Sequence, residues 1–104
     1  MIRKSLLTAV KKTIYEIEPS AVIVLFGSQS RGDYEHESDW DFLILVDGLV
    51  DEDRIDRIRH RLYELEWETG EVISSIVRNR EQWDSYPNTS SPFYNNIRRE
   101  GKAL

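Results

Sequence analysis

Residues 21–26 read AVIVLF, a continuous apolar run rich in β-branched residues that ends at Gly27. Such a run is typical of a strand that is buried on both faces of a sheet. A second run, FLILV, occupies residues 42–46 and ends at the turn dipeptide Asp47-Gly48. We therefore expect two central strands, joined by the long polar segment between them.

Helical periodicity precedes and follows this pair of strands. Before it, apolar residues recur at helical spacing and Pro19 supplies a stop, which predicts an amphipathic helix over residues 3–17. After it, apolar positions recur at intervals of three and four over residues 51–69, with three acidic residues placed to cap the first turn and Gly70 placed to end the helix. The apolar positions are Leu6, Val10, Ile14 and Ile17 in the first helix, and Ile55, Ile58, Leu62 and Leu65 in the second.

The rest of the chain predicts one more strand and one more helix. VISSIV at residues 72–77 is half apolar and half hydroxyl-bearing, and Ser91-Pro92 has the pattern of a helix start. We expect Phe93, Ile97 and Leu104 on one side of this last helix, and Tyr15, Tyr63 and Trp83 in the core. The order predicts an α+β fold of α/β-like character, a small mixed sheet of three or more strands flanked by helices, in a single domain spanning residues 1–104.

Composition excludes several classes of function. The 104 residues include no cysteine, which removes disulfides, thiolate metal sites and cysteine nucleophiles. The net charge of −5 gives no general attraction to nucleic acid, so we expect none as a partner. No apolar run approaches the roughly 18 residues that span a bilayer, and we expect a cytoplasmic protein.

The acidic residues are concentrated in one segment. Between residues 33 and 53 there are nine Asp or Glu and no Lys or Arg. Such a segment repels phosphate unless a cation intervenes. It is either a solvated acidic surface or a place where some of the acids hold Mg²⁺.

The residues that suggest chemistry lie between the first two predicted strands. Asp39 and Asp41 are two apart at the start of a strand, so their side chains project to the same side and repel each other unless a divalent cation lies between them. Gly27 permits a close backbone approach, and Ser28 can begin a helical turn whose N–H groups and hydroxyl would meet a phosphate. The plainer alternative is a loop start followed by polar residues before a buried strand.

The whole segment GSQSRGDYEHESDWD, residues 27–41, resembles the signature of nucleotidyltransferases related to DNA polymerase beta. At this chain length the resemblance is to the minimal nucleotidyltransferases, and it covers about residues 5–80. It implies that Gly27 and Ser28 hold a nucleoside triphosphate and that Asp39 and Asp41 are catalytic ligands of Mg²⁺. By the same resemblance Arg31 adds a phosphate contact and Ser38, directly before Asp39, belongs to the nucleotide-binding segment.

The resemblance also implies a reaction and a partner. Members of this family transfer a nucleoside monophosphate from a triphosphate such as ATP to a hydroxyl, and they are often antitoxins paired with a helical HEPN-domain protein. Apolar surface that few helices can cover is then available to such a partner or to a homodimer.

The chain departs from the family pattern at one place. Active members have a third carboxylate on the neighbouring strand, where this sequence has Ser74 or Ser75, and Glu71 at the beginning of that strand is the nearest acid. Two functions therefore stay open. One is an active nucleotidyltransferase, weak or dependent on a partner, and the other is a nucleotide-binding or protein-binding module that keeps the fold without the activity.

Overall fold

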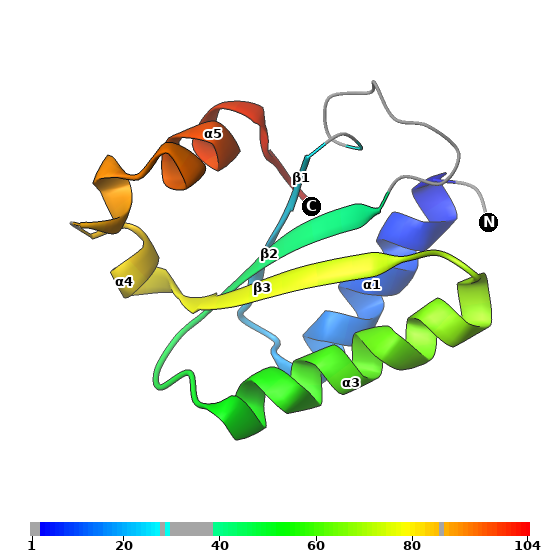
Figure 1. The fold of residues 1–104 in the computed structure, drawn as a ribbon. Helices are drawn as coiled ribbons and strands as arrows, with labels where there is room; N and C mark the ends of the chain where they lie inside the picture. The colour runs from blue at the N-terminus through cyan, green and yellow to red at the C-terminus, as the bar shows by residue number, and fades with distance from the viewer. Residues whose placement is uncertain (1–2, 28, 30–38, 86) are drawn as a thin grey trace.

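The computed structural model describes residues 3–27, 29, 39–85 and 87–104, and helices alternate with strands along most of this length (Figure 1). In chain order the elements are α1 (Arg3–Ile17), β1 (Val22–Phe26), β2 (Trp40–Val46), α3 (Glu52–Thr69), β3 (Ile73–Asn79), α4 (Arg80–Trp83), η1 (Asn88–Ser90), α5 (Pro92–Glu100) and β4 (Lys102–Ala103).

The strands form one sheet in the order β3-β2-β1-β4. β1 pairs antiparallel with both β2 and β4, whereas β2 pairs parallel with β3, as expected for strands joined by a helical crossover. The sheet is therefore mixed and flanked by helices, which confirms the fold class predicted from the sequence.

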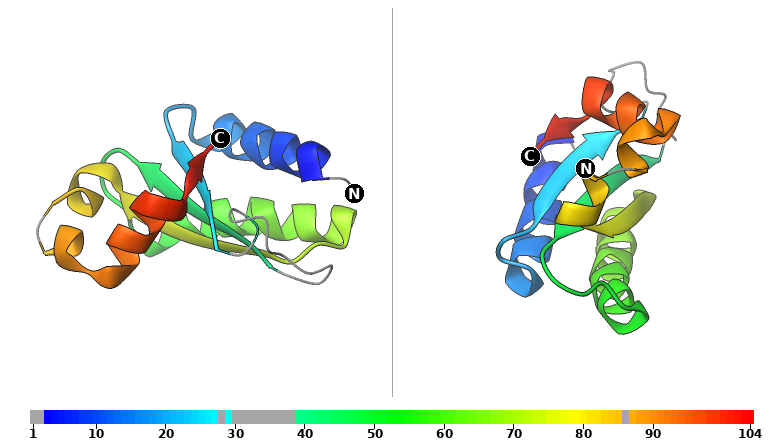
Figure 2. Two further views of the ribbon diagram at one scale, coloured as in Figure 1. Left: turned by 90° about the horizontal axis from the view of Figure 1, so that it is seen from above. Right: turned by 90° about the vertical axis from the view of Figure 1, so that its left-hand side faces the viewer.

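Helices cover the two faces of the sheet unequally (Figure 2). We call the side under α1 and α3 the α1/α3 face and the side under α4 and α5 the α4/α5 face. The first holds a continuous core in which Phe42 and Ile44 of β2 are fully buried. The second holds a smaller cluster: Leu43, Leu45, Trp83, Tyr94 and Ile97. β2 contributes to both because its side chains alternate between the faces.

Capping residues fix both ends of α3 and the start of α5. The side chain of Asp51 accepts a hydrogen bond from the Arg54 N–H at the start of α3, and Gly70 ends the helix with φ of 74°. Ser91 caps α5 in the same way, with Pro92 in the first turn. These are the start and stop signals that the sequence predicts.

The ends of the strands differ from the prediction. β2 begins at Trp40 rather than residue 42, because Trp40 is buried on the α1/α3 face and Asp41 still pairs with Phe26 of β1. The short strand β4 was not predicted. It follows α5 directly. The sequence predicted Leu104 on one side of α5, but Leu104 lies beyond β4 and donates its N–H to the Ile23 carbonyl.

One expectation about aromatic side chains is wrong. Tyr63 is 54% exposed, because the buried side of α3 is set by Leu62 and Leu65. Phe93, which the sequence places on one side of α5 with Ile97, contacts the rings of Phe26 and Trp83 and is 41% exposed. Trp83 is buried as predicted.

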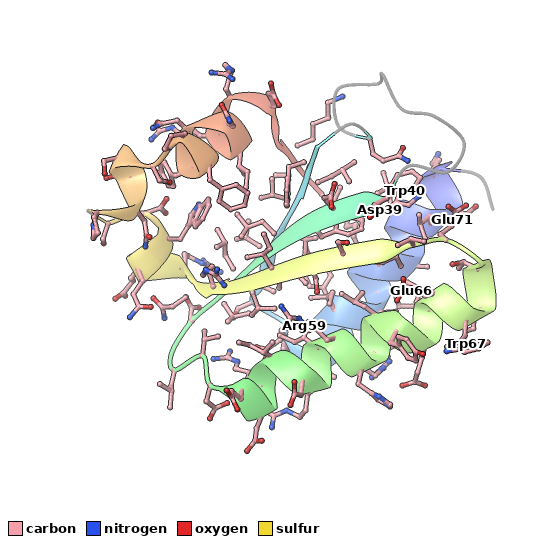
Figure 3. All side chains as sticks on the ribbon, viewed as in Figure 1. Asp39, Trp40, Arg59, Glu66, Trp67 and Glu71 are labelled. Carbon is pink, nitrogen blue, oxygen red and sulfur yellow. The ribbon has the colours of Figure 1, made fainter. Side chains whose placement is uncertain are left out.

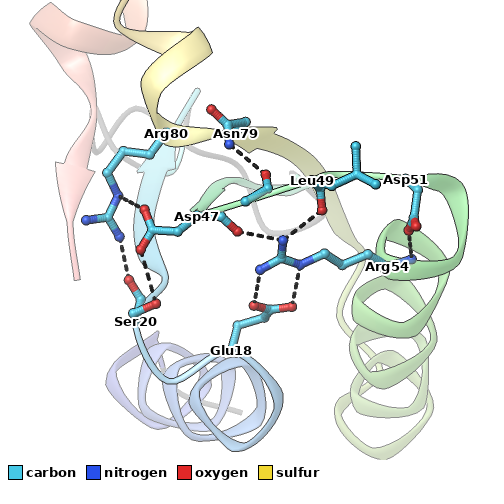
Figure 4. A network of polar contacts seen from close by, with 9 residues as sticks. Glu18, Ser20, Asp47, Leu49, Asp51, Arg54, Asn79 and Arg80 are labelled. Atoms are coloured by element: carbon cyan, nitrogen blue, oxygen red, sulfur yellow. Dashed lines mark hydrogen bonds and ion pairs between the residues drawn. The ribbon is translucent and has the colours of Figure 1, made fainter.

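A polar network lies at the end of the sheet where β1 begins and β2 ends (Figure 4). The Arg54 guanidinium donates to both oxygens of Glu18, at 2.7 and 2.9 Å, and to the carbonyls of Asp47 and Leu49. Hydrogen bonding to Arg54 holds the pKa of Glu18 below its ordinary value, against the opposing effect of burial. The network ties α1 and α3 to the loop after β2.

None of the helices in the described ranges has the length and apolar content that crossing a bilayer requires.

Candidate active site

Asp41 is the second residue of β2, and its place in the strand decides where it points. Leu43 and Leu45 pack on the α4/α5 face, so Asp41 projects to that face and Trp40, which is 5% exposed, projects to the other. Trp40 is part of the core on the α1/α3 face. Asp39 directly precedes the strand and is exposed (Figure 3).

Gly27 and Asp41 meet at the end of the β1–β2 pair. Phe26 and Asp41 are register partners, so the residue after Phe26 lies against the aspartate. A Cβ placed on Gly27 would be 2.6 Å from Oδ2 of Asp41, and the φ of Gly27 is +77°. Both the space and the backbone conformation therefore require glycine. The structure brings together two of the residues that the sequence singles out, from the ends of neighbouring strands.

The environment of Asp41 disfavours its charge. Burial raises the pKa of the Asp41 carboxyl above its ordinary value, and the negative charge of Asp39 raises it further. Burial and a neighbouring like charge both favour the protonated form of an acid. A divalent cation would relieve both effects, and Mg²⁺ typically takes one or two carboxylates together with water and substrate phosphates. Asp39 and Asp41 fit that donor set.

The position beside Asp41 on the next strand carries a hydroxyl instead of a carboxylate. Asp41 and Ser74 are register partners in the parallel β2–β3 pair, and Ser74 is exposed. Ile76, two residues further along β3, packs on the α4/α5 face, so Ser74 projects to the same face as Asp41. Of the two serines considered, Ser74 is the one that occupies the place expected for a third acid.

Glu71 does not replace that acid. Its Oε2 accepts a hydrogen bond from the Trp40 indole at 3.2 Å, and Trp40 packs on the opposite face from Asp41 (Figure 3). In the described part of the chain, no group of three or more His, Cys, Asp or Glu is arranged to hold a metal ion.

Three predicted nucleotide-binding residues, Ser28, Arg31 and Ser38, lie outside the described residues, and their roles stay predictions. Gln29, between two of them in sequence, is 2% exposed and was not singled out from the sequence. Phe26 was also missed. Residues 22–26 are all apolar, so the sequence shows no alternation that would assign Phe26 to a face, and its place opposite Asp41 follows only from the antiparallel register.

Comparison with known proteins gives consistent results. The family model described as "Nucleotidyltransferase domain" matches residues 5–99. A protein of Methanocaldococcus jannaschii named "Putative protein adenylyltransferase MJ0604" is 40% identical over 82 residues, which is 79% of this chain and 75% of that protein. A solved structure titled "Crystal structure of the toxin-antitoxin with AMP-PNP" has a similar fold, with a TM-score of 0.66 and 20% identity, over 92% of this chain and 69% of the other.

Proposed function

Because this chain belongs to the nucleotidyltransferase domain family, we propose that it binds a magnesium nucleoside triphosphate on the α4/α5 face and transfers the nucleoside monophosphate to a hydroxyl group. The observation that carries the proposal is the close approach of Gly27 to Asp41. It holds the end of β1 directly against a carboxylate whose charge is otherwise unfavourable.

In this proposal each part of the site has one task. Asp39 and Asp41 hold Mg²⁺, and the backbone at Gly27 together with Ser28 receives the phosphates. Bound there, the ion would neutralise phosphate charge and orient the group that is transferred. The acceptor oxygen forms a bond to the α-phosphorus, the bond from that phosphorus to the bridging oxygen breaks, pyrophosphate leaves, and the hydroxyl proton passes to solvent.

ATP is the nucleotide that we favour, and a partner protein is the acceptor that we favour. The relative from Methanocaldococcus jannaschii is named for protein adenylyl transfer, and the similar fold comes from a toxin–antitoxin structure with an ATP analogue. A helical HEPN-like partner is the form that the sequence resemblance suggests. A cytoplasmic location is also part of the proposal.

Ser74 supports a second candidate function. With a hydroxyl where Asp41 has its register partner on β3, the described residues give the site two carboxylates to hold metal ions. A two-metal mechanism uses one ion to activate the attacking hydroxyl and another to steady the leaving phosphates. The alternative is therefore a binding module, which holds a nucleotide or a partner protein without transferring anything.

Transfer of label separates the two candidates. The chain is co-expressed with the product of its neighbouring gene, purified, and incubated with Mg²⁺ and ATP labelled at the α-phosphate. We expect labelled partner protein and released pyrophosphate, both abolished by Asp39→Asn with Asp41→Asn. Asp56→Asn, an exposed carboxylate on α3, is the matched control and should leave transfer unchanged.

Ser74→Asp makes the test sharper. Placing a carboxylate beside Asp41 should raise the rate by about a hundredfold or more, the lower end of the range that a single positioned catalytic group contributes. If neither the wild type nor Ser74→Asp transfers label while both still bind ATP with Mg²⁺, the chain is a binding module. If ATP binding does not depend on Asp39 and Asp41, the proposed site is wrong.

A further inference from the structure

A row of aromatic rings begins beside Asp41 and runs along the α4/α5 face. Phe26 is the register partner of Asp41 and packs on the same face. The ring of Phe93 lies 5.8 Å from that of Phe26, at an interplanar angle of 86°, and 5.9 Å from that of Trp83. Trp83 in turn lies 5.0 Å from Tyr94. The row joins the candidate site to the small core under α5.

Phe93 differs from the other α4 and α5 members of the row in its exposure. Trp83 and Tyr94 are 8% and 5% exposed, whereas Phe93 is 41% exposed. α5 already buries Tyr94 and Ile97, so packing of the helix does not require an aromatic residue at position 93. The Phe93 ring thus exposes apolar surface to solvent beside Phe26, the register partner of Asp41.

The support beneath this ring is fixed. Phe93 lies in the first turn of α5, which begins with the cap at Ser91 and with Pro92. The Tyr94 hydroxyl hydrogen-bonds the Asp84 carboxylate at 3.1 Å. Beyond the helix, β4 pairs with β1. A ligand that stacks on a ring already held in place loses little affinity to ordering of the protein.

The position suits one part of a nucleotide. Directly opposed residues of an antiparallel pair have Cα atoms about 4.5–5.5 Å apart, so Phe26 adjoins Asp41 and Phe93 is the next ring beyond it. A triphosphate held at Asp41 and Gly27 has its base about one sugar away from the α-phosphate. Aromatic rings bind bases of every kind by stacking on their faces.

We propose that Phe93, backed by Phe26, is the nucleobase-stacking residue of the site. The inference rests on the proposed function, since it places the base relative to phosphates at Asp41. It assigns a residue on α5, outside the segment that carries the family signature. We expect the site to bind a nucleotide more tightly than a polyphosphate that lacks a base. We expect little discrimination between bases, because stacking does not read their hydrogen-bonding groups.

The test compares ATP with inorganic tripolyphosphate, which has the phosphates and lacks the nucleoside. Binding of both is measured by calorimetry with Mg²⁺ present. For the wild type we expect ATP to bind about tenfold more tightly than tripolyphosphate, the lower part of the range that alanine substitution gives for stacking. Phe93→Leu keeps apolar contact with Phe26 and Trp83 and removes the ring, so ATP affinity should fall about tenfold while tripolyphosphate affinity is unchanged.

Two further variants serve as controls. Phe93→Tyr keeps a ring and should restore ATP affinity to within about twofold of the wild type. Trp67→Ala removes a side chain that is 76% exposed on α3, across the sheet, and should change neither ligand. Equal ATP affinity in Phe93→Leu and wild type, with tripolyphosphate binding intact, would overturn the base-stacking assignment alone. Binding of neither ligand by the wild type would overturn the proposed function and this inference with it.

Discussion

The two faces of the sheet are built from the same strands and have different properties. Among the described residues, fifteen form the buried cluster on the α1/α3 face, beneath the two long helices. On the α4/α5 face, the described part of the chain contributes five residues to the buried cluster, and an open pocket of about 510 Å³ lies beside α5. The same strand, β2, contributes Phe42 and Ile44 to the first face and Asp41 to the second.

The α1/α3 face contributes mainly to stability, whereas the α4/α5 face is the one available for binding. Burial of apolar surface is the main favourable term in folding, and the α1/α3 face accounts for most of it here. The α4/α5 face is thinly covered, and there Gly27 lies against the Asp41 carboxylate while the exposed ring of Phe93 contacts Phe26, the register partner of Asp41. A ligand can reach that face without displacing the main core.

The largest expected effect comes from matched cavities in the two faces. Ile44→Ala removes a fully buried side chain from the α1/α3 core, and Ile97→Ala removes one that is 5% exposed from the smaller cluster. We expect losses of about 4 and about 2 kcal/mol in the free energy of unfolding, because the thinner layer relaxes around its cavity more easily. Urea denaturation measures both. Equal losses would contradict the division between the faces.

A smaller effect is expected at the network that joins α1 to α3. Glu18→Gln removes the charge that pairs with Arg54, where the two side chains are 14% and 17% exposed, and should cost about 1–2 kcal/mol at neutral pH. The pKa of Glu18 is lowered in the folded state, so the wild type holds this stability above the unfolded pKa of about 4.5 and loses it as the pH falls through the lowered value.

Denaturation at a series of pH values tests that prediction. The difference between wild type and Glu18→Gln should be constant near neutral pH and shrink on acidification. A difference that persists unchanged at pH 2 would show that the effect comes from packing rather than from charge.

The smallest expected effect has the opposite sign. The pKa of Asp41 is raised in the folded state, so ionised Asp41 destabilises the fold, and the wild type loses stability as the pH rises from 3.8 through the raised value. Asp41→Asn should raise the Tm at pH 7 by a few degrees at most, since partial exposure keeps the effect below about 1 kcal/mol.

Thermal melts with and without Mg²⁺ and ATP complete this comparison. The ligands should raise the Tm of the wild type and leave that of Asp41→Asn unchanged, because a ligand stabilises only the state to which it binds. A lower Tm for the variant at pH 7 without ligand would contradict the view that Asp41 is kept for binding at a cost in stability.

Local signals in the sequence predicted most of the framework. Apolar runs located the two central strands, and the caps at Asp51, Gly70 and Ser91 located helix ends, because these signals act over a few residues. β4 was not predicted, because a strand of two residues is too short to show a hydrophobic period in the sequence. Tyr63 was assigned to the core although it lies just outside the arc of α3 that the sheet covers.

The candidate site was predictable only in part, for a related reason. The spacing of Gly27, Asp39 and Asp41 indicated one pocket, and the structure places Gly27 against Asp41. The positions of Phe26 and Ser74 beside Asp41 depend on strand register. The contact between Phe93 and Phe26 depends on how α5 packs over the sheet. Such long-range pairings leave no local pattern to detect.

The magnesium dependence of ATP binding tests the central claim most directly. Calorimetry with and without Mg²⁺ is carried out on the wild type, on Asp39→Asn with Asp41→Asn, and on the control Asp56→Asn. We predict that the wild type and the control bind ATP only with Mg²⁺, and that the double variant loses at least tenfold in affinity. Equal affinity in the double variant and the wild type would contradict the assignment of Asp39 and Asp41 as the metal-binding pair.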